Sequence, residues 1–256
     1  MRKKRFIYTL AAVLLMCSAA GVGAGCGKSS PALLDSFGTH LDTLMTSKDK
    51  LSKMDGAAAD LCVIENEDGF SENDIEAPAG ALFNITDQKT LYSKNANDER
   101  EIASITKIMT ALLAMKYADL SQEVTISYTP EGLESSAVLC GFEQGDKMML
   151  SSLLSAALIY SGNDAAIDIA IAVAGSQEAF VDMMNQESKE LMTSHTHFAN
   201  PTGLTQSKHY SSVYDVYLMF QECLKYPTFR DIIARGSFLC YYTNAGGENV
   251  TKDFNN

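Results

Sequence analysis

The sequence predicts a mixed α/β (α+β) domain in which an antiparallel sheet is interrupted by a helical subdomain. Short β-prone runs stand near residue 80 and again near the last residues of the chain. Long apolar segments with helical spacing lie between them. Strands that precede and follow a block of helices are typical of a sheet with a helical insertion. The 256 residues are enough to bury a large core.

The first strands are expected at the start of this domain, which we place at residues 79–256. The runs Gly80–Ile85 and Thr90–Ser93 are β-prone and are joined by four polar residues, so they predict a hairpin. A further short strand is predicted at 124–127. Near the end, two β-prone runs flank the turn-forming segment 244–247, which predicts a second hairpin.

Apolar residues at helical spacing predict five helices in the middle of the chain. The first is apolar almost all round, which indicates a buried helix. The second and third are separated only by Ser161-Gly162-Asn163, and Ser176 is a suitable N-cap for the fourth. The five predicted helices span residues 105–115, 149–160, 164–173, 176–192 and 215–224.

The N-terminus has the pattern of an export signal. Within residues 1–25, four basic residues precede an apolar stretch and a run of small residues. Cys26 leaves two alternatives open, namely simple cleavage of the signal peptide or lipidation of this cysteine. The residues around Cys26 resemble a lipobox, although Gly23 stands where leucine is usual. Either one places the protein in the bacterial cell envelope, outside the cytoplasm. Residues 26–78 are expected to be a tether with an amphipathic helix.

The charge and the cysteines exclude some classes of function. A formal charge of -12 argues against a nucleic-acid partner, because phosphate binding needs a basic surface. The cysteines of the folded part are far apart and have no C-x-x-C spacing, so metal binding by their thiolates is not expected. No cofactor is expected either. They are interpreted as buried free thiols, with a disulfide left open. These cysteines are Cys62, Cys140, Cys223 and Cys240.

The strongest candidate catalytic motif is Ser104-Ile105-Thr106-Lys107. A serine in the first turn of a helix and a lysine one turn later share a face, so the hydroxyl and the amine come within hydrogen-bonding reach. Burial disfavours the ammonium, so Lys107 can act as the general base that activates Ser104 as nucleophile. The same pattern at 47–50 lies in the polar tether, where nothing excludes water.

The second candidate is Ser161-Gly162-Asn163, at the break between two apolar helices. There the Ser161 hydroxyl can pass a proton to a leaving amine while the Asn163 amide holds the substrate backbone. Alone, this segment would be interpreted as a helix cap and turn. Because it follows Ser104 in the expected order, the catalytic interpretation is favoured.

Together these motifs resemble those of the low-molecular-mass penicillin-binding proteins of the D-alanyl-D-alanine carboxypeptidase (peptidase S11) type. The stretch 103–112 is similar to their nucleophile helix, and 161–166 is similar to their second motif. Two more stretches, 196–204 and His209-Tyr210, are similar to further landmarks of the family. The resemblance implies the serine β-lactamase/penicillin-binding-protein-like fold for the region from about Ala79 onward.

The same resemblance implies a serine-type D-Ala-D-Ala carboxypeptidase that trims peptidoglycan stem peptides through an acyl-enzyme. In this scheme Ser104 carries the acyl group, Lys107 is the base, Ser161 shuttles the proton and Asn163 binds the substrate. The implied partners are stem peptides ending in D-Ala-D-Ala and, as covalent inhibitors, β-lactam antibiotics. A lipidated Cys26 would add a membrane tether.

One element of the family pattern is absent from the sequence. The family carries Lys-Thr-Gly on a later strand, where the lysine binds the substrate carboxylate and the strand supplies half of the oxyanion hole. No Lys-Thr-Gly occurs in the 256 residues. The expectation is either a fragment without the C-terminal strands or an impaired enzyme, because losing one oxyanion donor costs about 10²–10³ in rate.

Two rival functions stay open at this point. A β-lactamase would use the same serine, but no E-x-x-L-N run follows Ser161 to activate water. The other rival is a non-catalytic protein that only binds wall peptides, which the absent Lys-Thr-Gly motif suggests.

Overall fold

The computed structural model describes residues 61–64, 75–128 and 133–256. The predicted signal peptide, the lipidation site and the amphipathic segment of the tether lie outside the described residues. The chain divides into two compact units, residues 1–96 and 97–256.

In the first unit, the strands β1 (Gly80–Asn84) and β2 (Lys89–Lys94) form a two-stranded antiparallel sheet. The hairpin predicted from the sequence is therefore confirmed. Leu82 and Tyr92 pair across the strands and are both buried. The turn is closed by the Asn84 side chain, whose Oδ1 accepts hydrogen bonds from two backbone N–H groups of the loop, as Asx turns do.

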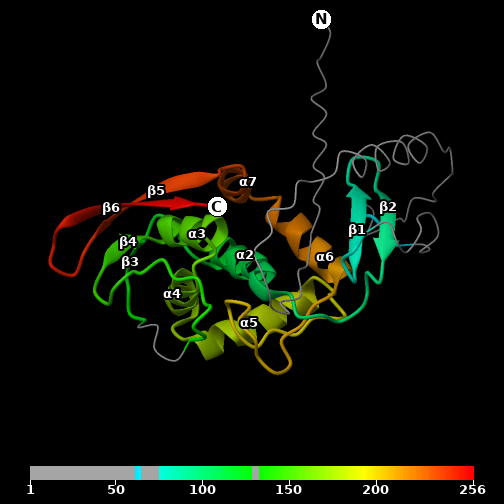
Figure 1. Cartoon of the computed structure of the whole chain (residues 1–256), viewed down its shortest axis with the longest axis horizontal. Helices are drawn as coiled ribbons and strands as arrows, with labels where there is room; N and C mark the ends of the chain where they lie inside the picture. The colour runs from blue at the N-terminus through cyan, green and yellow to red at the C-terminus, as the bar shows by residue number, and fades with distance from the viewer. Residues whose placement is uncertain (1–60, 65–74, 129–132) are drawn as a thin grey trace, which may run out of the picture. The chain divides into compact units, whose positions relative to one another are not determined.

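The second unit contains a four-stranded antiparallel sheet with the order β3-β4-β5-β6 (Figure 1). Its strands are β3 (Glu123–Thr125), β4 (Lys147–Met149), β5 (Ser237–Thr243) and β6 (Asn249–Asn255). The predicted C-terminal hairpin is confirmed as β5 and β6, which pair along their whole length. The sequence did not predict β4, because this strand runs directly into α3 and its last residue, Met149, falls in the predicted helix 149–160.

The helices of the second unit follow the prediction closely, with one addition. The additional helix, α7, begins with a proline at its first turn, where the missing N–H costs nothing, and its seven residues give little periodic signal. Ser176 accepts the N-cap hydrogen bond of α5 as expected. The helical segments are η1 (Ala103–Thr106), α2 (Lys107–Tyr117), α3 (Leu150–Ile159), α4 (Asn163–Ala174), α5 (Gln177–Glu190), α6 (Val213–Cys223) and α7 (Pro227–Ile233).

The core is built around α2, which contacts α3, α4, α5 and α6 (Figure 1). Its side chains Met109, Leu112 and Leu113 are completely buried, as the apolar pattern predicts. Each fully buried leucine stabilises the fold by about 1.5–3 kcal/mol relative to an exposed one. The helix that follows the candidate nucleophile is therefore held on several sides.

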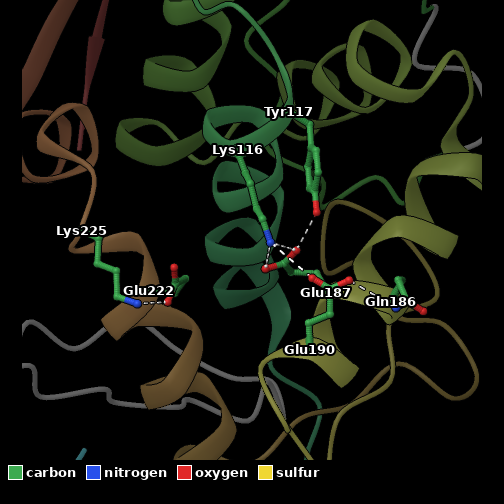
Figure 2. A network of polar contacts seen from close by, with 7 residues as sticks. All are labelled: Lys116, Tyr117, Gln186, Glu187, Glu190, Glu222 and Lys225. Carbon is green, nitrogen blue, oxygen red and sulfur yellow. Dashed lines mark hydrogen bonds and ion pairs between the residues drawn. The ribbon is translucent and has the colours of Figure 1, made fainter. Parts of the chain in front are cut away.

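An ion pair fixes the C-terminal end of α2 to α5. Figure 2 shows Lys116 and Tyr117 pointing from α2 toward Glu187. The Lys116 Nζ donates to both Glu187 carboxylate oxygens, at 2.9 and 2.8 Å, and the Tyr117 hydroxyl donates at 3.1 Å. Hydrogen bonding to Glu187 raises the pKa of Lys116 above its usual value. Because Glu187 is only 2% exposed, this carboxylate depends on its three hydrogen bonds.

We expect Lys116→Met to lower the free energy of unfolding by about 1–3 kcal/mol, because the buried Glu187 loses both hydrogen bonds from Lys116 and keeps only the one from Tyr117. The matched control is Lys225→Met, which removes an exposed ion pair with Glu222 and should change stability by less than about 0.5 kcal/mol. Urea unfolding followed by circular dichroism measures both. Equal effects of the two substitutions would contradict the assigned role of Glu187.

Candidate active site

The candidate nucleophile lies in a tight turn before α2, and not in the α-helix itself as the sequence suggested. Residues 103–106 form the 3-10 turn η1, and the α-helix begins at Lys107. Ala103 has a left-handed backbone (φ 45°). Gly203 packs directly against the Ala103 carbonyl and leaves no room for a Cβ atom. A glycine from a distant loop therefore packs against the turn that holds Ser104.

The structure places the other three predicted site residues around the amine of Lys107. Its Nζ lies 3.2 Å from the Ser104 Oγ and 3.4 Å from the Ser161 Oγ. It also lies 2.9 Å from the Asn163 Oδ1 and 3.0 Å from the Thr202 carbonyl oxygen. Lys107 is 2% exposed, so these oxygens take the place of water around the amine.

The second motif lies at the break between α3 and α4, as predicted. Ser161 has a left-handed backbone (φ 65°), and a side chain at Gly162 would collide with the Cys140 Sγ. Asn163 begins α4, and its Nδ2 donates to the Val138 carbonyl at 3.1 Å while its Oδ1 accepts from Lys107. The Asn163 amide thus links the lysine to the neighbouring loop.

Burial controls the protonation of the central amine. Desolvation lowers the pKa of Lys107 from 10.5 to about 8, and the charges of Cys140 and Asp164 oppose this shift. Burial also raises the pKa of the Cys140 thiol well above its usual value, so this thiol is uncharged near pH 8. We therefore regard Asp164 as the effective opposing charge. A substantial fraction of Lys107 is neutral under mildly alkaline conditions and can accept a proton.

Asp164 anchors the loop that borders the second motif. Its carboxylate accepts hydrogen bonds from the backbone N–H groups of Cys140 (2.8 Å), Gly141 (2.8 Å) and Ala165 (2.9 Å). Asp164 is almost completely buried. The sequence contained a signal for this role, because an acidic residue directly after Asn163 falls in the first turn of α4, where negative charge is favourable.

The loop at residues 200–204 is a part of the site that sequence reasoning assigned no role. The Asn200 Oδ1 accepts hydrogen bonds from the Thr202 N–H, the Thr202 hydroxyl and the Gly203 N–H, which fixes the loop. The Thr110 hydroxyl of α2 donates to the Pro201 carbonyl at 2.7 Å. These contacts aim the Thr202 carbonyl at Lys107. The sequence identifies residues 196–204 as similar to a family landmark, but a pattern of side chains does not reveal the role of a backbone carbonyl.

Other features of the described residues bear on the remaining expectations. Within these residues, no cluster of three or more His, Cys, Asp and Glu side chains is arranged to hold a metal ion. In the same part of the chain, no helix is both long enough and apolar enough to cross a membrane. Cys140, Cys223 and Cys240 are buried free thiols, which agrees with their first interpretation, and Cys62 is also buried.

Comparisons with known proteins show which family this chain is similar to. A family model described as "D-alanyl-D-alanine carboxypeptidase" (peptidase S11) matches residues 66–235. The D-alanyl-D-alanine carboxypeptidase DacF of Bacillus subtilis is 40% identical over 158 residues, which are 60% of this chain and 40% of that protein. The D-alanyl-D-alanine carboxypeptidase of Streptomyces sp. K15 is 30% identical over 189 residues, which are 70% of this chain and 65% of that protein.

A solved structure supports the same relationship. The crystal structure of the Streptomyces K15 DD-transpeptidase matches with a TM-score of 0.67 and 27% identity, over 71% of this chain and 74% of that one. The predicted fold class is therefore confirmed. The matched region spans only 40% and 65% of the lengths of the two curated relatives. Because the family model covers well over half of the chain, this chain belongs to the D-alanyl-D-alanine carboxypeptidase family, peptidase S11.

Proposed function

We propose that this protein is a serine-type D-Ala-D-Ala carboxypeptidase that trims peptidoglycan stem peptides. The observation that carries the proposal is the buried Lys107 amine, which lies within 3.2 Å of the Ser104 Oγ and 3.4 Å of the Ser161 Oγ. A neutral lysine beside a serine hydroxyl is a recognised way to activate this weak nucleophile. Family membership supports the choice of substrate.

Acylation would begin with proton transfer from Ser104 to the neutral Lys107 amine. The Ser104 Oγ forms a bond to the carbonyl carbon of the penultimate D-Ala, and the carbonyl π-electrons move to the oxygen. The positive N-terminus of the η1–α2 segment favours the negative charge that develops near Ser104. When the peptide bond breaks, the proton on Lys107 passes through the Ser161 hydroxyl to the amine of the departing D-Ala.

Deacylation would use the same base. Lys107 is neutral again once its proton has passed through Ser161 to the departing D-Ala, so it can take a proton from a water molecule that attacks the ester carbonyl. The ester bond to the Ser104 Oγ then breaks, and Ser104 recovers its proton from Lys107. Asn163 and the Thr202 carbonyl hold the amine in place through both steps, which limits the motion needed between them. The resemblance also assigns Asn163 to substrate binding.

The same proposal includes the place of action and the inhibitors. We propose that residues 1–25 direct export and that the protein works in the cell envelope, released by cleavage or tethered through a lipidated Cys26. The basic and apolar pattern of these residues supports export. Intact mass of the protein isolated from the envelope distinguishes a diacylglyceryl group from a free N-terminus. β-Lactam antibiotics are proposed to acylate Ser104, as the family resemblance implies.

Treatment of the protein with penicillin should give one covalent adduct in intact-mass spectra, and Ser104→Ala should abolish it because the nucleophile is lost. Ser47→Ala is the matched control, since it alters the other S-x-x-K pattern and should leave the adduct intact. An adduct that persists in Ser104→Ala would remove this residue from its role. Rapid release of hydrolysed drug would favour a β-lactamase, and a folded but unreactive wild type would favour the non-catalytic alternative.

The acylation rate should rise with pH through a midpoint near pH 8, because Lys107 must lose its proton before it can act as base. Asp164→Asn should move this midpoint to lower pH, since the carboxylate charge raises the pKa of Lys107 and the amide has no such charge. Stopped-flow acylation by a fluorescent penicillin between pH 6 and 10 would measure both profiles. A midpoint that moves to higher pH in Asp164→Asn would contradict the assigned electrostatics.

A further inference from the structure

A buried histidine links the candidate nucleophile turn to the loop that carries Thr202. His209 is 5% exposed and lies before α6. Its Nδ1 accepts the backbone N–H of Ala199 at 3.0 Å, and its Nε2 lies 2.7 Å from the Thr106 Oγ1. Because a backbone N–H can only donate, the Nδ1 of His209 carries no proton. The neutral ring therefore has its proton on Nε2 and donates it to Thr106.

Thr106 occupies a decisive position in the turn. It stands between Ser104 and Lys107, and its side chain is 1% exposed. The hydrogen bond to His209 spans 103 residues of sequence, so it ties the turn to a part of the chain that local helix geometry does not control. A second link between the same two regions is the contact of Gly203 with the backbone of Ala103.

We infer that His209 is a positioning residue for the proposed acylation, because through Thr106 it holds the turn that sets Ser104 within reach of Lys107. This inference rests on the function proposed above. The Ser104–Lys107 distance of 3.2 Å is already near the upper end for a hydrogen bond, so a small rotation of η1 would break it. Misplacement by about 1 Å can cost as much as 10²-fold in rate.

The neutral state of the ring is part of this role. A doubly protonated imidazole would place an N–H on Nδ1 against the N–H of Ala199, and the hydrogen bond between His209 and Ala199 would be lost. Burial lowers the pKa of His209 to about 4, and the charge of His197 acts in the same direction. His209 therefore stays neutral over the range in which Lys107 titrates, so the two protonation events are separate.

The test compares two substitutions at Thr106 that separate hydrogen bonding from packing. Thr106→Val keeps the shape and removes the hydroxyl, whereas Thr106→Ser keeps the hydroxyl and removes the methyl group. We expect acylation by a fluorescent penicillin to slow by about ten-fold or more in Thr106→Val and by less than about three-fold in Thr106→Ser. The opposite order would show that the site needs the methyl group and would overturn the inference.

A substitution of His209, the hydrogen-bond partner of Thr106, completes a double-mutant cycle. His209→Phe should slow acylation at least as much as Thr106→Val, because it also removes the acceptor of the Ala199 N–H. The double variant should be no slower than His209→Phe alone, because the bond that Thr106→Val breaks is already absent there. Rates are compared per folded protein, at temperatures below the onset of unfolding of each variant. Fully independent effects of the two substitutions would overturn the inference.

A second measurement does not require catalysis. With lysine labelled with ¹³C at Cε, NMR follows the titration of Lys107, whose signal is assigned as the one lost in Lys107→Met. We expect Thr106→Val and His209→Phe to raise the titration midpoint of Lys107 above the wild-type value near pH 8, because a loosened turn admits water to the amine. Thr106→Ser should leave this midpoint unchanged. An unchanged midpoint in both of the first two variants would overturn the inference. A wild type that titrates as expected but never reacts with penicillin would instead refute the proposed function.

Discussion

The burial of one amine is the constraint on which the rest of this site depends. Transferring a lysine side chain out of water disfavours its charged form. Four oxygen atoms surround the Nζ of Lys107 and offset part of the free energy of this desolvation through hydrogen bonds. Those oxygens come from the η1 turn, the α3–α4 break, the first residue of α4 and the loop around Thr202. Segments far apart in sequence must therefore close on the same point, and the packing of α2 among its neighbouring helices is what allows them to do so.

Backbone strain occurs at two of the places where these segments meet. Ala103 and Ser161 both adopt left-handed conformations although neither is glycine, and they flank the lysine from opposite motifs. Such residues cost of order 1–3 kcal/mol each and persist only where the surrounding structure determines them. Here Gly203 packs against Ala103, and Gly162 follows Ser161 against Cys140, so close contacts hold both strained positions. The strain turns both serine hydroxyls toward the amine instead of leaving them in regular helices.

Much of this arrangement could be predicted from the sequence, and the remainder could not for physical reasons. Local patterns carry local structure, so the two hairpins, the apolar helix after Ser104 and the break at Ser161 were all predicted. The sequence does not predict the 3-10 turn that holds Ser104, because local patterns do not separate 3-10 from α geometry, and the close contact of Ala103 with Gly203 comes from a distant part of the chain. The sequence does not predict the hydrogen bond between His209 and Thr106, because these residues meet only through long-range folding. It does not predict the contact of the Thr202 carbonyl with Lys107 either, because that contact is also long-range and uses a backbone atom, which a side-chain pattern does not reveal.

The lowered pKa of Lys107 survives beside a carboxylate because that carboxylate is occupied elsewhere. An acidic side chain in direct contact would restore the charge of the lysine, since opposite charges within about 4–6 Å favour the charged form. Asp164 instead gives its oxygens to three backbone N–H groups, at 2.8 to 2.9 Å, and acts on Lys107 only through space. The amine meets neutral hydroxyl, amide and carbonyl oxygens, which orient it without fixing its charge. Desolvation is then the dominant influence on the pKa of Lys107. The lowered pKa leaves part of the lysine neutral, and a neutral amine can act as a base.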